Sequence, residues 1–109
     1  MKKINNDPFR AISDSNRREI LMMISKENLS INDIAENFDI SRPAVSKHIK
    51  ILYTAGFILI ETKGKERICG LKPDGFEEIS KWIEYFEEYW NSKIKNLENL
   101  LNRNKNQKQ

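Results

Sequence analysis

The sequence has almost none of the side chains that bind soft metal ions or form disulfide bonds. Its 109 residues include one cysteine, Cys69, and one histidine, His48. A single cysteine cannot form a disulfide within the chain, and a zinc or copper site needs three or four thiolate or imidazole ligands. We therefore expect no metal site, no cofactor and a cytoplasmic location.

Long apolar runs and catalytic groupings are missing as well. No run of about 18 apolar residues, the length of a membrane helix, occurs, and the first eight residues, MKKINNDP, lack the apolar segment of a signal peptide. There is no glycine-rich phosphate loop, and no serine, cysteine or carboxylate is placed as a catalytic partner of His48. We expect no catalytic residues and no enzymatic activity.

The net charge of +3 is small, but it is unevenly distributed. Residues 41–72 contain seven lysines and arginines against two glutamates, whereas residues 74–90 contain six acidic residues against one lysine. One part of the molecule should therefore attract polyanions and another repel them, which is typical of a nucleic-acid-binding protein.

The segment from Ser30 to Gly56 predicts two short helices joined by a tight turn. Ser30 and Ser41 are good N-cap residues, each followed by apolar residues at helical spacing. Pro43 falls in the first turn of the second helix, where a missing N–H costs nothing. The outer face of that helix is cationic and free of large apolar residues, as in the recognition helix of a helix-turn-helix.

A basic β-hairpin is predicted directly after this pair. Residues 57–62 and 66–71 form its strands, and Lys63-Gly64-Lys65 forms its tip. The expected fold is therefore mainly α with a small β-hairpin, a winged helix-turn-helix with a long C-terminal dimerisation helix. The candidate DNA-binding residues are Arg42, Pro43, Ser46, Lys47, His48, Lys50, Lys63, Lys65 and Arg67.

Two further helices are expected before this segment, over residues 8–12 and 15–25, the second capped by Asp14. Arg17 and Arg18 lie in its first turn, where the helix dipole disfavours cations. They are either solvated or part of a phosphate clamp at the helix N-terminus. Cys69 is expected to be a small apolar filler on the return strand.

The last helix is predicted from Asp74 to Leu101, a length of roughly 42 Å. Its apolar residues recur every three or four positions over more surface than a domain of this size can cover, so we expect a homodimer joined through it. A helix folded entirely onto its own domain is the alternative. The candidate interface residues are Phe9, Ile12, Ile79, Ile83, Phe86, Trp90, Ile94 and Leu97. Residues 1–7 are expected to be flexible, residues 8–101 to form the domain, and residues 102–109 a disordered basic tail.

The chain resembles the ArsR/SmtB family of winged-helix repressors. The resemblance is carried by FRAISDSNRREIL, by LSINDIAENFDISRPAVSKHIKILYTAGFI, by GKERICGL and by the aromatic final helix. It is greatest to the metal-independent branch that contains autorepressors such as that of the sporulation-delay operon. Metal-sensing members carry cysteines in the helix equivalent to residues 31–38, or histidine, aspartate or glutamate ligands on the last helix. This sequence has no cysteine in the first helix and no histidine in the last.

The resemblance implies a dimer whose recognition helices reach successive major grooves of a palindromic operator. The expected function is a dimeric, sequence-specific transcriptional repressor, autoregulatory and without a metal-sensing site. Two alternatives stay open. One is a regulator that responds to a thiol reagent or ligand through Cys69. The other is a winged-helix protein-interaction module, whose protein partner is unknown.

Overall fold

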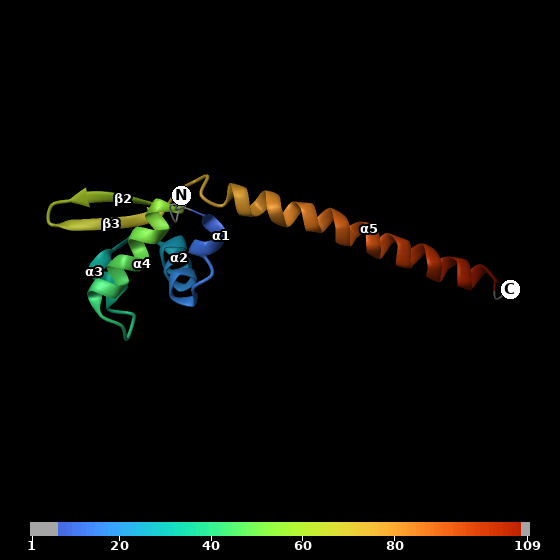
Figure 1. Ribbon diagram of the computed structural model, residues 1–109, viewed down its shortest axis with the longest axis horizontal. Helices are drawn as coiled ribbons and strands as arrows, with labels where there is room; N and C mark the ends of the chain where they lie inside the picture. The colour runs from blue at the N-terminus through green and yellow to red at the C-terminus, as the bar shows by residue number, and fades with distance from the viewer. Residues whose placement is uncertain (1–6, 108–109) are drawn as a thin grey trace, which may run out of the picture. The chain divides into compact units, whose positions relative to one another are not determined.

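The computed structural model of the protein describes residues 7–107, which form two units. The first unit, Met1–Glu77, contains four helices and a sheet, and the second, Glu78–Gln109, comprises the last helix. The elements are α1 (Pro8–Ala11), α2 (Ser15–Lys26), β1 (Leu29–Ser30), α3 (Ile31–Ala35), α4 (Arg42–Thr54), β2 (Ile58–Lys63), β3 (Glu66–Leu71) and α5 (Glu77–Gln107), as Figure 1 shows. The expectation of a flexible N-terminus falls on residues 1–6, which lie outside the described residues.

The helices of the first unit begin where capping side chains satisfy their first backbone N–H groups. Asp14 accepts from the N–H groups of Asn16 and Arg17, at 2.8 and 3.2 Å. Ser30 accepts from Asp33 N at 3.0 Å and Ser41 from Ala44 N at 3.2 Å. All three predicted caps are confirmed, and they fix the starts of α2 and of the two helix-turn-helix helices.

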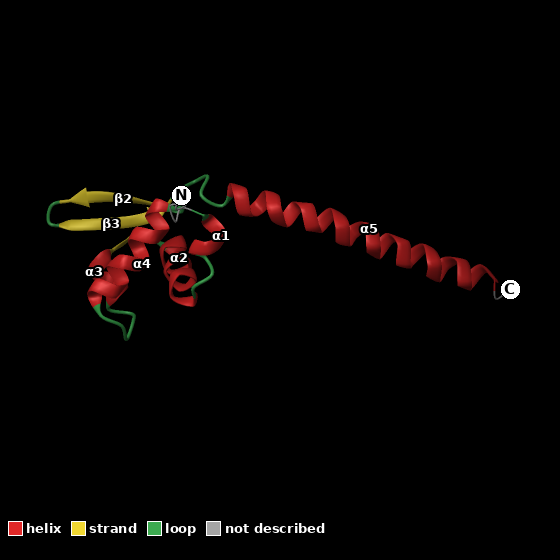
Figure 2. Ribbon diagram, viewed as in Figure 1, coloured by secondary structure: helices red, strands yellow, loops and turns green. Residues whose placement is uncertain are grey.

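The sheet has three antiparallel strands in the order β1-β3-β2. Figure 2 shows β2 and β3 side by side. The predicted hairpin forms, with Ile60 opposite Cys69. Its first strand lies one residue later than predicted, so Lys63 belongs to β2 and pairs with Glu66 rather than lying in the tip. Strand β1 was not predicted. It pairs Leu29 with Cys69 and Ser30 with Ile68, so the strand ends where Ser30 caps α3. This pairing joins the helix-turn-helix to the wing.

The core of the first unit lies between the sheet and the helices. Its apolar residues come from every helix of this unit and from the strands; they are Ala11, Ile20, Leu21, Ile24, Ile31, Ile34, Val45, Ile49, Leu52, Phe57, Ile58 and Cys69. On α4 the apolar residues at helical spacing form a buried stripe of Val45, Ile49 and Leu52, each at most 1% exposed. The opposite face of α4 is left for a ligand.

The last helix begins and ends later than predicted. Asp74 was expected to cap it, but residues 73–76 form a turn in which Gly75 N donates to Lys72 O at 2.9 Å. A Cβ on Gly75 would lie 2.9 Å from Gly56 O, so the turn needs glycine to approach the end of α4 closely. The Phe76 ring packs on Phe57, with centroids 4.8 Å apart.

At its other end α5 continues to Gln107 rather than stopping at Leu101. Residues 102–107, expected to be disordered, are therefore helical; residues 108–109 lie outside the described part. This stretch contains no proline or glycine, so nothing in its sequence breaks the helix. Over residues 7–107, no helix combines the length and apolar character that crossing a membrane requires.

Candidate nucleic-acid interface

The outer face of α4 carries the predicted recognition residues. Arg42, Pro43, Lys47 and Lys50 are exposed, and Ser46 is half-buried between them and the core. Because the buried stripe fixes the rotation of the helix about its axis, these side chains point away from the core together. Their short or cationic character leaves room for close approach to base edges and phosphates.

Arg42 also ties the two helices of the helix-turn-helix together. Its Nε donates to Asn32 Oδ1 on α3 at 2.6 Å. A bond from a charged donor to an amide oxygen is stronger than one between neutral groups. Asn32 had no predicted role, because Asn32 and Arg42 are ten residues apart in the chain. The bond holds the first residue of α4 in place while leaving Arg42 exposed.

The wing lies beside the recognition helix. A hollow of about 390 Å³ between α4 and the sheet is lined by residues that include Ser46, Lys50 and Arg67. A smaller hollow of about 100 Å³, at the start of α4, is lined by residues that include Arg42, Ser46, Lys65 and Arg67. Five of the candidate residues from α4 and the wing thus border these two hollows, although they come from segments about twenty residues apart.

The wing tip is less uniformly cationic than predicted. Lys63 lies 3.9 Å from Glu61, with both side chains largely exposed, so this pair contributes little to stability. Glu66 borders the same small hollow as Lys65 and Arg67. Lys65 and Arg67 therefore supply the positive charge nearest to the recognition helix, and Lys63 is partly neutralised.

His48 is in contact with Arg17 of α2, a neighbour that the sequence did not reveal. An Arg17 terminal nitrogen lies 3.0 Å from His48 Nδ1, and Arg17 Nε donates to Ala11 O at 2.7 Å. A guanidinium can only donate, so Nδ1 accepts and the other ring nitrogen carries the hydrogen. Arg17 thereby joins α1, α2 and α4, which is neither the solvated role nor the phosphate clamp that we considered. Arg18 donates to Ile12 O at 2.8 Å.

The environment of Arg17 also affects Asp14. Burial of its carboxyl group raises the pKa, but this is outweighed by hydrogen bonds from Arg17 N and Asn16 N and by the nearby Arg17 charge. The pKa of Asp14 therefore lies below its ordinary value of 3.8. The carboxylate stays ionised and supports the start of α2.

Cys69 is fully buried on β3, at 0% exposure. Burial raises the pKa of its thiol above the ordinary value of 9.0, and the Arg67 charge offsets only part of this effect. A reactive thiol needs a lowered pKa and access to solvent. These observations fit the filler role and give no support to a thiol sensor. Among residues 7–107, no three His, Cys, Asp or Glu side chains are grouped as metal ligands.

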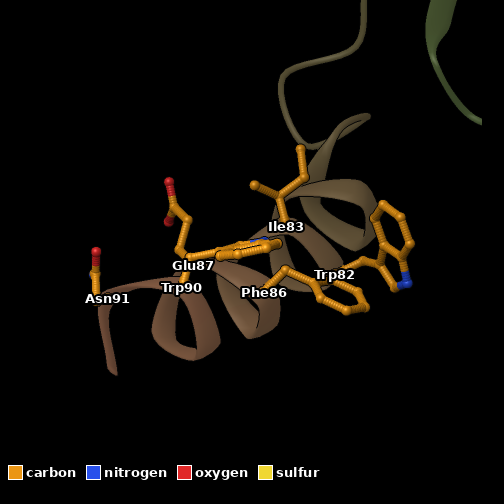
Figure 3. A pocket seen from close by; sticks show the side chains of 6 residues that line it. All are labelled: Trp82, Ile83, Phe86, Glu87, Trp90 and Asn91. Atoms are coloured by element: carbon orange, nitrogen blue, oxygen red, sulfur yellow. The ribbon is translucent and has the colours of Figure 1, made fainter. Parts of the chain in front are cut away.

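The apolar stripe of α5 is exposed over most of its length. Ile83, Phe86 and Trp90 are 46%, 39% and 60% exposed, and Ile94 and Leu97 follow them at 54% and 56%. Ile79 differs, because it is only 8% exposed. Figure 3 shows Trp82, Ile83, Phe86 and Trp90 lining an open hollow of about 390 Å³ along successive turns. Such a surface is larger than soluble monomers normally leave uncovered.

The other two candidate interface residues, Phe9 and Ile12, belong to the first unit. Phe9 and Ile12 are half-buried at α1. Ile12 borders a hollow of about 430 Å³ whose apolar lining also includes Leu21, Met22 and Phe76. The structure thus places Ile12 at the edge of an apolar surface of its own unit.

Comparison with known proteins finds similar transcriptional regulators. The family model described as bacterial regulatory protein, arsR family, matches residues 14–59. The transcriptional repressor SdpR of Bacillus subtilis is 36% identical over 81 residues, which cover 74% of this chain and 90% of that protein. The HTH-type transcriptional regulator Rv2034 of Mycobacterium tuberculosis is 31% identical, covering 72% and 73% of the two chains.

Solved structures agree with this result. The crystal structure of the ArsR family transcriptional regulator RHA00566 matches with a TM-score of 0.71 at 28% identity, over 77% of this chain and 92% of that chain. A homodimeric winged helix-turn-helix DNA-binding domain from Mycobacterium bovis shares the fold, with a TM-score of 0.60 at 12% identity, over 74% and 75%. The predicted winged helix is confirmed, as is the expectation of a regulator rather than an enzyme.

Proposed function

We propose, because this chain belongs to the ArsR family of DNA-binding transcriptional regulators, that it is a homodimeric, sequence-specific repressor. The observation that carries the proposal is the pair of hollows that bring wing residues Lys65 and Arg67 beside Ser46 of α4. A helix in the major groove and a cationic wing beside it can bind one duplex at adjacent positions.

The candidate residues divide into two roles. Ser46 and Lys47, on the outward face of α4, are proposed to contact base edges and set sequence preference. Phosphate contacts are proposed for the remaining cations of this surface: Arg42, Lys50, Lys63, Lys65 and Arg67. Pro43, which lacks a backbone N–H, is proposed to touch the DNA by packing alone. His48 is proposed to act mainly by holding α4 against α2, because Arg17 occupies its Nδ1.

The dimer is proposed to form through the exposed stripe of α5, with Phe9 and Ile12 as further candidates. The homodimeric state of the Mycobacterium bovis domain and the apolar surface of α5 support this. A dimer would present two recognition helices to a palindromic operator with half-sites one helical turn apart. SdpR is named a transcriptional repressor, which supports repression. Autoregulation, independence from metal ions and a cytoplasmic location are proposed with it.

A fluorescence-anisotropy titration over a range of salt concentrations tests the DNA contacts. The probe is a labelled duplex from the region upstream of the protein's own coding sequence. Neutralising about six phosphates predicts a slope of log affinity against log salt near −5. Lys65→Ala should weaken binding to every duplex about equally and reduce the slope by about one. Ser46→Ala should instead change the preference between the specific duplex and a scrambled one.

Lys81→Ala serves as the matched control, because Lys81 is an exposed lysine on α5 in the acidic part of the chain. It should leave both the slope and the preference unchanged. A salt-independent affinity, or an equal response to Lys65→Ala and Lys81→Ala, would overturn the proposed interface.

A further inference from the structure

The small hollow at the start of α4 is lined mainly by polar and charged side chains. It measures about 100 Å³, and residues of α3, of α4 and of the β2–β3 hairpin border it. Its lining includes three cations, Arg42, Lys65 and Arg67, and one carboxylate, that of Glu66. Three positive charges against one negative charge leave two positive charges around a hollow of a few cubic water diameters.

These cations are not neutralised by other side chains of the protein. Among residues 7–107, no ion pair joins Arg42, Lys65 or Arg67 to an acidic side chain, that of Glu66 included. Like charges that converge on one hollow repel one another, and an anion placed between them replaces this repulsion by attraction. The charge of the hollow is therefore complementary to a doubly charged anion.

Arg42 is held in one orientation at the edge of this hollow. Its Nε donates to Asn32 Oδ1 at 2.6 Å, and Asn32 borders the same hollow. A guanidinium has five N–H groups, so the four on its two terminal nitrogens are left for another partner. Two of them can donate in parallel to two oxygens of a phosphate or sulfate. Because the Asn32 bond fixes the guanidinium beforehand, less conformational freedom is lost when an anion binds.

We propose that this hollow is an oxyanion site, which binds one tetrahedral dianionic group between Arg42, Lys65 and Arg67. Its volume suits a single phosphate or sulfate, since about 100 Å³ is the space of roughly three water molecules in the liquid. The Ser46 hydroxyl, which also borders the hollow, can donate to the same group. Asn32 is a positioning residue that acts through Arg42.

The group can come from two sources. One is a backbone phosphate of the bound duplex, and for this source the inference rests on the proposed DNA interface. The other is a free inorganic anion, which would then compete with the duplex for the same cations. Either source supplies the same chemistry, so the site itself is tested first on the protein without DNA.

Titration of the free protein with sodium sulfate tests the site. Two-dimensional ¹H–¹⁵N NMR observes the Nε–H groups of the arginine side chains, and sodium chloride at the same ionic strength is the reference. Sulfate should shift the Arg42 and Arg67 signals along a saturable curve, with a dissociation constant on the order of 1 mM. Inorganic phosphate should give the same pattern, whereas chloride should give no saturable shift.

Variants identify the residues that hold the anion, and the same spectra show that each variant is folded. Arg67→Gln should weaken sulfate binding at least about tenfold, because it removes a charge-assisted contact. Asn32→Ala should weaken it about threefold although every cation remains, because the Arg42 guanidinium is no longer held. Lys26→Gln is the matched control, since Lys26 is an exposed lysine of α2 that borders neither hollow of the interface; it should bind sulfate as the unaltered protein does.

A response to sulfate that is no different from the response to chloride would overturn the oxyanion site. Equal sulfate binding by the unaltered protein and by Arg67→Gln would overturn it as well. If Asn32→Ala binds sulfate as the unaltered protein does, the positioning role of Asn32 is wrong.

Fluorescence anisotropy of the labelled duplex then identifies the source of the group. At matched sodium concentration, replacing chloride by sulfate at ten times its dissociation constant should lower DNA affinity at least about tenfold, because sulfate must leave before a backbone phosphate enters. This loss should disappear in Arg67→Gln. Saturable sulfate binding without the loss would assign the hollow to free anions and overturn the DNA source. A protein that binds sulfate but no duplex would overturn the proposed repressor and leave the oxyanion site standing.

Discussion

At the scale of single residues, the contact between Arg17 and His48 decides how the recognition helix is held. The two residues are 31 positions apart in the chain and 3.0 Å apart in space. His48→Ala would leave a guanidinium donor without this acceptor, which costs about 1.5 kcal/mol or more of folding stability. His48→Gln keeps an acceptor and should recover most of the loss. Urea denaturation measures both.

The same variants separate a positioning role from a phosphate contact. If His48 positions α4, His48→Ala lowers DNA affinity without changing the salt slope, and His48→Gln restores it. A phosphate contact made by a charged imidazolium would instead reduce the slope by about one. A reduced slope in both variants would thus show that His48 touches the DNA backbone.

Cys69 leads to a prediction about reactivity. Because the thiol is buried and its pKa is raised, a thiol reagent should label the native protein at least about 100-fold more slowly than the protein in denaturant. The rate of labelling by an absorbance assay measures this. Treatment with hydrogen peroxide should leave DNA binding unchanged. Fast labelling of the folded protein would revive the thiol-responsive alternative.

At the scale of elements, the start of α2 depends on Asp14. Asp14→Ala removes the acceptor for two backbone N–H groups and should cost about 1 kcal/mol of folding stability. The pKa of Asp14 is lower in the folded protein than its ordinary value of 3.8. Its ionisation therefore contributes stability that is present above this value and is lost as the pH falls through the folded pKa.

Asp14→Asn isolates the charge, because asparagine also caps helices well. Between pH 6 and the acid range below 3.8, the unaltered protein should lose more stability than the Asp14→Asn protein, as measured by denaturant unfolding at each pH. Equal losses would mean that Asp14 ionisation does not contribute.

The elements also show what the sequence can predict. Caps at Asp14, Ser30 and Ser41 were predictable because capping depends on residues two or three positions apart. Strand β1 was not, because two residues have no periodicity and this strand exists only through pairing with β3. The start of α5 was missed for a similar reason: the turn at residues 73–76 depends on the close approach of Gly75 to Gly56.

At the scale of the whole molecule, the fold and function class followed from the sequence, since helical and strand periodicities and the charge distribution are local properties. The site was predicted in part. Outward-facing residues of α4 and the wing could be named from spacing, but the Asn32–Arg42 and Arg17–His48 contacts join separate segments. No pattern along the chain specifies which side chains meet across a core, so these contacts needed the structure.

The exposed apolar stripe of α5 also determines how promoter occupancy depends on the concentration of the protein. If only the paired form can occupy both half-sites, then below the dissociation constant of the pair its abundance rises with the square of the chain concentration. Twofold changes in synthesis would then change promoter occupancy by up to about fourfold. Through the apolar stripe of α5, promoter occupancy would then respond steeply to the concentration of the protein, without any small-molecule signal.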